Sequence, residues 1–213
     1  MSNDVPIFDV FQPGLKRGAE RLAYAPHKRY FYVEHPTEGW RVYLRACCFL
    51  HEAGAPFQKE RFLVVKRFGG DPKKKTWEPP KGQMEGKDGL RHANKSILQL
   101  LEENVQREVE EEAKIREILH LTHTSLVLQS QEKDYPKNHY FQYHVFQGLV
   151  KPEEIQNAAA EFKWLQEHPA AWARLRKDKR EKDDIAWFSP KHTQMMGRWS
   201  PSLIVMYMAD KSS

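Results

Sequence analysis

Residues 82–115 read GQMEGKDGLRHANKSILQLLEENVQREVEEEAKI, and this stretch decides the fold. Ser96 is followed three residues later by Gln99, a spacing that predicts a capping box at the start of a helix. The apolar side chains that follow recur at spacings of three and four, which is typical of one buried helical stripe: Leu98, Leu101, Val105 and Val109. We therefore predict a helix that begins near Ser96 and buries one face.

Three carboxylates stand together on one edge of this helix. At about 100° per residue, Glu108, Glu111 and Glu112 lie side by side and border the apolar stripe. Like charges so placed repel one another, and a divalent cation among them would relieve the repulsion. Hard oxygen ligands of this kind suit Mg²⁺ or Mn²⁺. The alternative is an ordinary acidic surface helix with ion pairs to bases one turn away.

The rest of the chain alternates strand and helix patterns, which predicts a mixed α/β class of the α+β type. Residues 1–39 show four prolines and no sustained period, so we expect an irregular N-terminal arm with a short strand at 29–33. The other predicted elements are strands at 41–51, 61–67, 118–130, 139–150 and 185–188, a long loop at 68–89, a helix over 152–179 interrupted by Pro169, and a last helix that reaches Met208.

The composition is that of a soluble globular domain. The 213 residues include 34 Lys or Arg and 29 Asp or Glu, a formal net charge of +5, and 40% are apolar. The longest apolar run, residues 46–50, is far too short to span a membrane. The first thirty residues do not resemble a signal peptide, and the two cysteines are adjacent in the sequence. We expect a cytoplasmic or nuclear protein without a membrane partner.

The segment WEPPKG at 77–82 lies just before the helix, and from Gly82 to residue 115 the chain resembles a Nudix box. The family pattern is G-x5-E-x7-R-E-U-x-E-E-x-G-U, where U is a bulky apolar residue. Gly82 takes the first glycine, Asp88 takes the first acidic position, and REVEEEAKI at 107–115 matches the second half. The spacer from Asp88 to Arg107 holds 18 residues instead of 7, and Lys114 replaces the last glycine.

The resemblance covers residues 40–208 and implies a Nudix-like mixed β-sheet sandwiched between helices, followed by a tail at 209–213. It also implies Mg²⁺-dependent hydrolysis of a phosphoanhydride, with Mn²⁺ as a substitute. The residues that it implies as metal ligands are Glu108, Glu111, Glu112 and the Gly82 carbonyl, with Arg107 orienting Glu108.

Three further side chains are candidates for contact with the substrate. Lys81 and Arg67 would pair with phosphate oxygens, and Trp77 would stack on a base unless it packs inside the protein. No general base is assigned, because each acidic residue that family precedent makes possible also fits a solvated turn. These open alternatives are Glu132, Asp134, Asp183 and Asp184.

The substrate is expected to be highly anionic. Basic residues gather at 59–75 and 174–182, which favours an RNA cap or RNA 5′ end over a small nucleotide. A diphosphoinositol polyphosphate and a dinucleoside polyphosphate are alternatives, and the added spacer is expected to shape the mouth of the site. A different class of function is a non-catalytic Nudix-fold module that binds RNA or a protein. The three neighbouring glutamates argue against it, since repelling carboxylates have no use without a metal.

Overall fold

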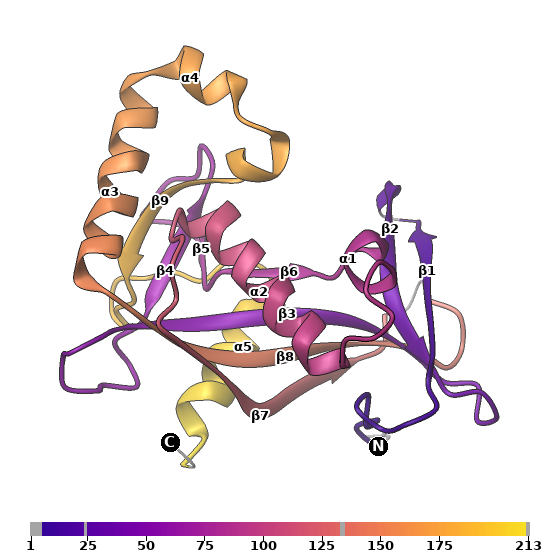
Figure 1. Ribbon diagram of the computed structural model, residues 1–213. Coiled ribbons are helices and arrows are strands. Elements are labelled where there is room, and N and C mark those ends of the chain that lie inside the picture. The colour runs from indigo at the N-terminus through magenta and orange to yellow at the C-terminus, as the bar shows by residue number, and fades with distance from the viewer. Residues whose placement is uncertain (1–5, 24, 133–134, 212–213) are drawn as a thin grey trace. The chain divides into compact units, whose positions relative to one another are not determined.

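The computed structural model describes residues 6–23, 25–132 and 135–211 (Figure 1). Its α+β class, with β-sheets and several helices, confirms the predicted fold class. The strands are β1 Lys16–Leu22, β2 Ala25–Glu34, β3 Arg41–Glu52, β4 Leu63–Arg67, β5 Trp77–Glu78, β6 Lys81–Gln83, β7 His120–Ser130, β8 His139–Val150 and β9 Lys182–Trp187. The helices are α1 Gly86–Leu90, α2 Ile97–Ala113, α3 Pro152–Glu167, α4 Pro169–Arg174, the 3₁₀ helix η1 Lys177–Arg180 and α5 Trp199–Ala209.

Two sheets form among the described residues. The larger has the order β1-β2-β3-β8-β7, with β6 paired to β3, and the smaller has the order β5-β4-β9. Strand β4 lies antiparallel to both of its neighbours. In Figure 1, α3 runs beside β9, which it contacts. No helix in the described ranges has the length and hydrophobicity that crossing a membrane requires.

The described residues form two compact units, each with its own core. The first unit takes its residues from 1–46, 82–104 and 127–144, and its core includes Phe31, Tyr43 and Phe141, all fully buried. The second unit takes its residues from 47–81, 105–126 and 145–213. In its core the rings of Phe49 and Tyr207 stack with their centroids 3.8 Å apart.

Helix α2 begins as its sequence predicts. The Ser96 N–H donates to Gln99 Oε1 at 2.9 Å, and the Gln99 N–H donates to Ser96 Oγ at 3.2 Å, which confirms the capping box. The helix ends at Ala113, and Lys114 follows with a left-handed φ of 60°. Glycine adopts this conformation without strain, which explains why the Nudix pattern has glycine there. The buried Lys114 ammonium compensates by donating to the carbonyls of Glu111 and Lys179.

The predicted short strand at 29–33 lies within β2, but the prediction of an irregular arm around it is wrong for residues 16–22 and 25–28. These residues form the antiparallel pair β1 and β2, with Lys16 opposite Glu34 and Gly18 opposite Tyr32. Strand β1, with the sequence KRGAERL, buries only Ala19 and Leu22, so it lacks the alternation that marks a strand in sequence. Its strand geometry comes from pairing with β2. The predicted domain limits, 40 and 208, stay a prediction.

The predicted loop at 68–89 contains β5, β6 and α1. Its glycines permit close packing as well as turns. A Cβ on Gly86 would lie 2.4 Å from the Ala19 Cβ, and one on Gly89 would lie 2.1 Å from the Phe31 ring. The short helix α1 therefore lies directly on β1 and β2 because two of its residues lack side chains. The other predicted elements are found within a few residues of their expected ends, and α4 begins at Pro169.

Candidate active site

The second unit contains a cavity of about 480 Å³ beside the C-terminal part of α2. Three residues that the sequence singled out line it: Arg67 at the end of β4, Lys81 at the start of β6, and Glu112 of α2. The other described residues in its wall are Phe68, Glu78, Glu181, Lys182 and Met196.

Strand pairing brings the charged groups of this wall together. Within the smaller sheet, Arg67 of β4 lies opposite Lys182 of β9, and Val65 lies opposite Glu78 of β5. The neighbouring Lys66 pairs with Asp183 at 2.5 Å. Alternation along β4 and β9 thus gives Arg67 and Lys182 to the cavity.

A buried ion-pair network lies at the centre of the cavity. The Lys182 ammonium lies 2.9 Å from Glu112 Oε1 and also donates to Glu78. The Lys81 ammonium donates to the same Glu78 carboxylate, and the Lys81 backbone N–H donates to Glu112 Oε2 at 2.9 Å. Glu78, Glu112 and Lys182 are 2%, 5% and 4% exposed. Two carboxylates and two ammonium groups therefore balance one another, and of the four only Lys81 is partly exposed.

The pKa directions follow from burial and these pairings. Burial alone would raise the pKa of Glu78, but Lys81 and Lys182 outweigh it and lower that pKa. Burial raises the pKa of Glu112, and the charge of Glu78 adds to the rise. Burial would lower the pKa of Lys182, yet Glu112 and Glu78 together raise it. The ammonium of Lys182 is therefore charged and held by both acids.

The predicted contact between Arg107 and Glu108 is present, and Arg107 also reaches a second carboxylate. The Arg107 guanidinium donates to Glu108 Oε1 and to Glu111 Oε2, both at 2.8 Å. Glu111 is buried, and neither of these glutamates is in the cavity wall. Arg107 thus fixes two of the three carboxylates on the edge of α2.

Comparison with known proteins decides the family. The family model described as NUDIX domain matches residues 45–195, which is most of the chain. The chain belongs to the NUDIX family. No curated protein gives a match. Among solved structures, a NUDIX hydrolase from Nitrosomonas europaea is 18% identical with a TM-score of 0.44, covering 78% of this chain and 88% of that one.

Two other solved structures show the range of proteins that this NUDIX chain is similar to. An Ap4A hydrolase from C. elegans is 17% identical with a TM-score of 0.39, covering 79% of this chain and 95% of that one. NrtR of Shewanella oneidensis, in complex with a 27mer DNA, is 14% identical with a TM-score of 0.43, covering 77% of this chain and 59% of that one. TM-scores below 0.5 add no argument to the family match.

The three glutamates on the edge of α2 have the donor atoms that a divalent cation needs. Glu108, Glu111 and Glu112 offer carboxylate oxygens, the donors that Mg²⁺ and Mn²⁺ prefer. In the described residues, however, no three His, Cys, Asp or Glu side chains are grouped as a metal site. Arg107 pairs with two of the glutamates and Lys182 with the third. Metal binding would therefore compete with ion pairs inside the chain.

The remaining predicted residues are not among those that line the cavity. Trp77 is buried and its indole N–H donates to the Pro72 carbonyl at 2.9 Å, which matches its alternative role in packing. Gly82 follows Lys81 in β6 and belongs to the first unit. Of the acids considered as a general base, Asp183 pairs with Lys66, while Glu132 and Asp184 are outside the wall. Asp134 lies outside the described residues.

Sequence reasoning missed the two residues that complete the network. Glu78 stands in the quoted WEPPKG segment, and an acid between an aromatic residue and two prolines was a usable signal. Lys182 was counted within the basic stretch 174–182 as surface charge, and the structure corrects this because Lys182 is buried. Nothing in the run KREKDD distinguishes Lys182 from the charged residues beside it.

Proposed function

We propose that this NUDIX protein hydrolyses a phosphoanhydride bond of a substrate bound in the cavity beside Glu112. The observation that carries the proposal is the meeting of Arg67, Lys81 and Glu112 in one cavity of about 480 Å³. Two of these residues carry side chains of a kind that can bind phosphate, and the third belongs to the carboxylate edge that suits a metal. Family membership supports the same reaction.

The basic and acidic side chains of the cavity have different proposed roles. Arg67 and Lys81 would bind the phosphate oxygens of the substrate. Glu112, with Glu108 and Glu111, would hold Mg²⁺ or Mn²⁺. When bound, the ion supplies charge neutralisation at the phosphates and lowers the pKa of an attacking water. Arg107 is a positioning residue, because it fixes Glu108 and Glu111 from the side.

An RNA 5′ end is the substrate that we place first. The net charge of +5 and the exposed bases of residues 73–75 support a polyanion. The support is smaller than the sequence suggested, because Lys66 and Lys182 of the two basic stretches are buried in ion pairs. A diphosphoinositol polyphosphate and a dinucleoside polyphosphate also contain a phosphoanhydride bond, and they serve as comparison substrates.

One observation favours a second candidate, a NUDIX module that binds its ligand without hydrolysis. The sequence argument against it was the repulsion of three unrelieved carboxylates. The structure removes that argument, because Arg107 and Lys182 neutralise these carboxylates within the chain. The carboxylate edge is therefore stable without a metal and does not by itself require catalysis.

A hydrolysis assay separates the two candidates. The full chain is incubated with 5′-capped RNA, 5′-triphosphate RNA, a diphosphoinositol polyphosphate and a dinucleoside polyphosphate, each with Mg²⁺, with Mn²⁺ or with EDTA. The hydrolase predicts a metal-dependent product from at least one of them, lost in Glu112→Gln and kept in Glu117→Gln, whose carboxylate is exposed. Binding without product under all metal conditions would overturn the hydrolase and leave the binding module.

A further inference from the structure

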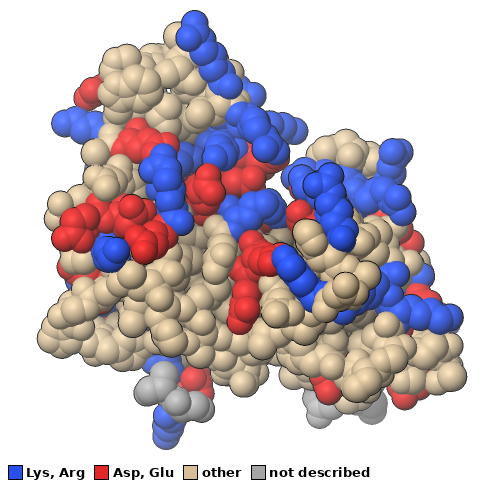
Figure 2. Space-filling model, in the orientation of Figure 1, with Lys and Arg blue, Asp and Glu red and all other residues tan. Residues whose placement is uncertain are grey.

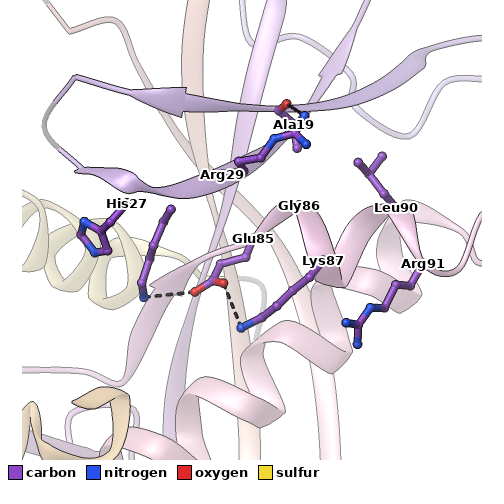
Figure 3. A pocket seen from close by; sticks show the side chains of 9 residues that line it. Ala19, His27, Arg29, Glu85, Gly86, Lys87, Leu90 and Arg91 are labelled. Atoms are coloured by element: carbon purple, nitrogen blue, oxygen red, sulfur yellow. Dashed lines mark hydrogen bonds and ion pairs between the residues drawn. The ribbon is translucent and has the colours of Figure 1, made fainter. Parts of the chain in front are cut away.

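A second cavity, of about 500 Å³, lies in the first unit between α1 and the hairpin of β1 and β2 (Figure 3). It plays no part in the proposed hydrolysis. The described residues in its wall are Ala19, His27, Lys28, Arg29, Glu85, Gly86, Lys87, Leu90 and Arg91.

Close backbone packing fixes the walls of this cavity. Gly86 and Gly89 let α1 approach Ala19 and Phe31 at distances where a Cβ would clash. After the helix, the Arg17 guanidinium of β1 donates to the carbonyls of Ala93 at 3.2 Å and Lys95 at 2.8 Å. The segment that carries Lys87 and Arg91 is thus tied to β1 at both ends, so the cavity needs little ordering when a ligand binds.

The cavity wall has a surplus of positive charge. Among its described residues, four are Lys or Arg and one, Glu85, is acidic. Glu85 pairs with Lys28 at 3.0 Å and with Lys87 at 2.9 Å, and Figure 3 shows the pair of Glu85 with Lys87. Burial would raise the pKa of Glu85, but the bonds from Lys87 and Lys28 outweigh it and lower that pKa. One ionised carboxylate is thus shared by two lysines, and the wall keeps a net charge of about +3.

The surplus charge faces solvent. Arg29, Lys87 and Arg91 are exposed, and Figure 2 shows Lys and Arg side chains gathered over α1 and the ends of β1 and β2. Ala19, Gly86 and Leu90 add a small apolar wall between the charged groups. A ligand that neutralises several bases at once in such a space has closely spaced negative charges, as linked phosphates do.

We propose that this cavity binds the oligophosphate group of a phosphorylated ligand. Arg91 offers a planar fork that matches phosphate oxygens, as does Arg29, which also donates to the Ala19 carbonyl at 2.6 Å, and Lys28 and Lys87 offer point charges. Because the wall is already cationic, this binding needs no metal ion. It therefore differs in kind from binding in the cavity beside Glu112, where the charges of the wall cancel.

Calorimetry with inorganic tripolyphosphate tests the proposal on the full chain in EDTA. We expect saturable binding that the double variant Lys87→Glu/Arg91→Glu weakens by roughly tenfold or more, since charge-assisted contacts are lost. Lys163→Glu, on the exposed face of α3, is the matched control and leaves the affinity unchanged. Glu85→Gln removes the competing carboxylate and is expected to strengthen binding a few-fold.

Several results would overturn the proposal. They are an absence of saturable binding, an unchanged affinity in the double variant, or a loss caused by Arg67→Glu in the other cavity instead. Circular dichroism of each variant checks that the fold is retained, and Arg91→Glu alone, on an exposed side chain, serves if the double variant unfolds.

Competition by ATP or by 5′-triphosphate RNA then identifies the source of the phosphates, and displacement of tripolyphosphate by either one supports the site. Displacement by neither, in a chain that binds tripolyphosphate, would overturn the assignment to a phosphorylated ligand. All of these are binding measurements without metal. Their results therefore test this cavity even if the hydrolysis assay gives no product.

Discussion

The two cavities are nearly equal in volume, about 480 and 500 Å³, but their walls differ in charge. Among the described residues, the wall beside Glu112 has three bases and three acids, whereas the wall over α1 has four bases and one acid. The central charges of the first wall are buried, and most bases of the second are exposed.

Burial explains the difference. A charge removed from water is costly unless an opposite charge and hydrogen bonds compensate it, so the buried acids Glu78 and Glu112 are paired with the buried Lys182, and Glu78 also with Lys81. An exposed Lys or Arg stays hydrated and needs no partner, so the wall over α1 keeps its surplus. A neutral wall attracts phosphates only weakly until a metal adds charge, while a cationic wall attracts them directly.

The largest expected effect is on hydrolysis in the cavity beside Glu112. Glu112→Gln should lower kcat/KM on the order of 100-fold or more, because it removes a metal ligand and frees Lys182 from one acid. Glu111→Gln should act in the same direction. Steady-state kinetics at saturating Mg²⁺ measure this, with Glu117→Gln as control. Near wild-type turnover in Glu112→Gln would show that hydrolysis does not take place in the cavity beside Glu112.

The next effect is on stability. It compares the loss of unfolding free energy when a buried base is removed with the loss when an exposed base is removed. Lys182→Met should lower the free energy of unfolding by about 3–5 kcal/mol, because Glu78 and Glu112 then face each other in a buried site without their shared cation. Lys87→Met, which removes an exposed partner of Glu85, should cost less than about 1 kcal/mol. Urea denaturation measures both. Equal losses would contradict the explanation by burial.

A third effect tests whether close packing of α1 maintains the cavity between α1 and the hairpin of β1 and β2. Gly89→Ala should cost about 1–3 kcal/mol, because its Cβ would lie 2.1 Å from the ring of the fully buried Phe31. In the second unit, the Cβ of Gly148→Ala would lie 2.9 Å from Leu50 Cδ2 and 3.1 Å from Ile118 Cγ2, both looser contacts than the one at Gly89. Thermal denaturation should show the larger loss for Gly89→Ala. The reverse order would mean that α1 is not held by close packing.

The last effect is a pH dependence in the second unit. Burial lowers the pKa of His51 to about 4, although its bond to the Arg61 carbonyl opposes the shift. In the unfolded chain a histidine takes up a proton near pH 6.5, so between about pH 6.5 and 4 the unfolded state binds more protons. The free energy of unfolding should therefore fall as the pH drops through this window, by roughly 2 kcal/mol by pH 5.

His51→Asn isolates this contribution. The variant is expected to be less stable at pH 7, because the bond between His51 Nε2 and the Tyr207 hydroxyl is altered, but to lose less stability between pH 7 and pH 5. His27→Asn, on an exposed side chain of the first unit, is the matched control. An unchanged slope in His51→Asn would show that this buried histidine does not set the dependence.

The sequence predicted well where the signal is local. Ser96 and Gln99 cap α2, Val105 and Val109 are buried, and Arg107 reaches Glu108, all over spans shorter than one helix. The resemblance over residues 82–115 also led to the family, in spite of the long spacer and Lys114. Helix geometry fixes such neighbours from spacing alone.

The sequence by itself determined α2, its carboxylate edge and the family, because a helix places residues three and four apart side by side whatever surrounds it. Only the tertiary structure decided how those carboxylates are neutralised. Lys182 meets Glu78 across 104 positions in sequence through the pairing of β5 and β9 with β4, and no local pattern encodes that meeting. The same holds for β1, and for the two glycines that seat α1 on it, since strand pairing and close packing depend on a partner far along the chain.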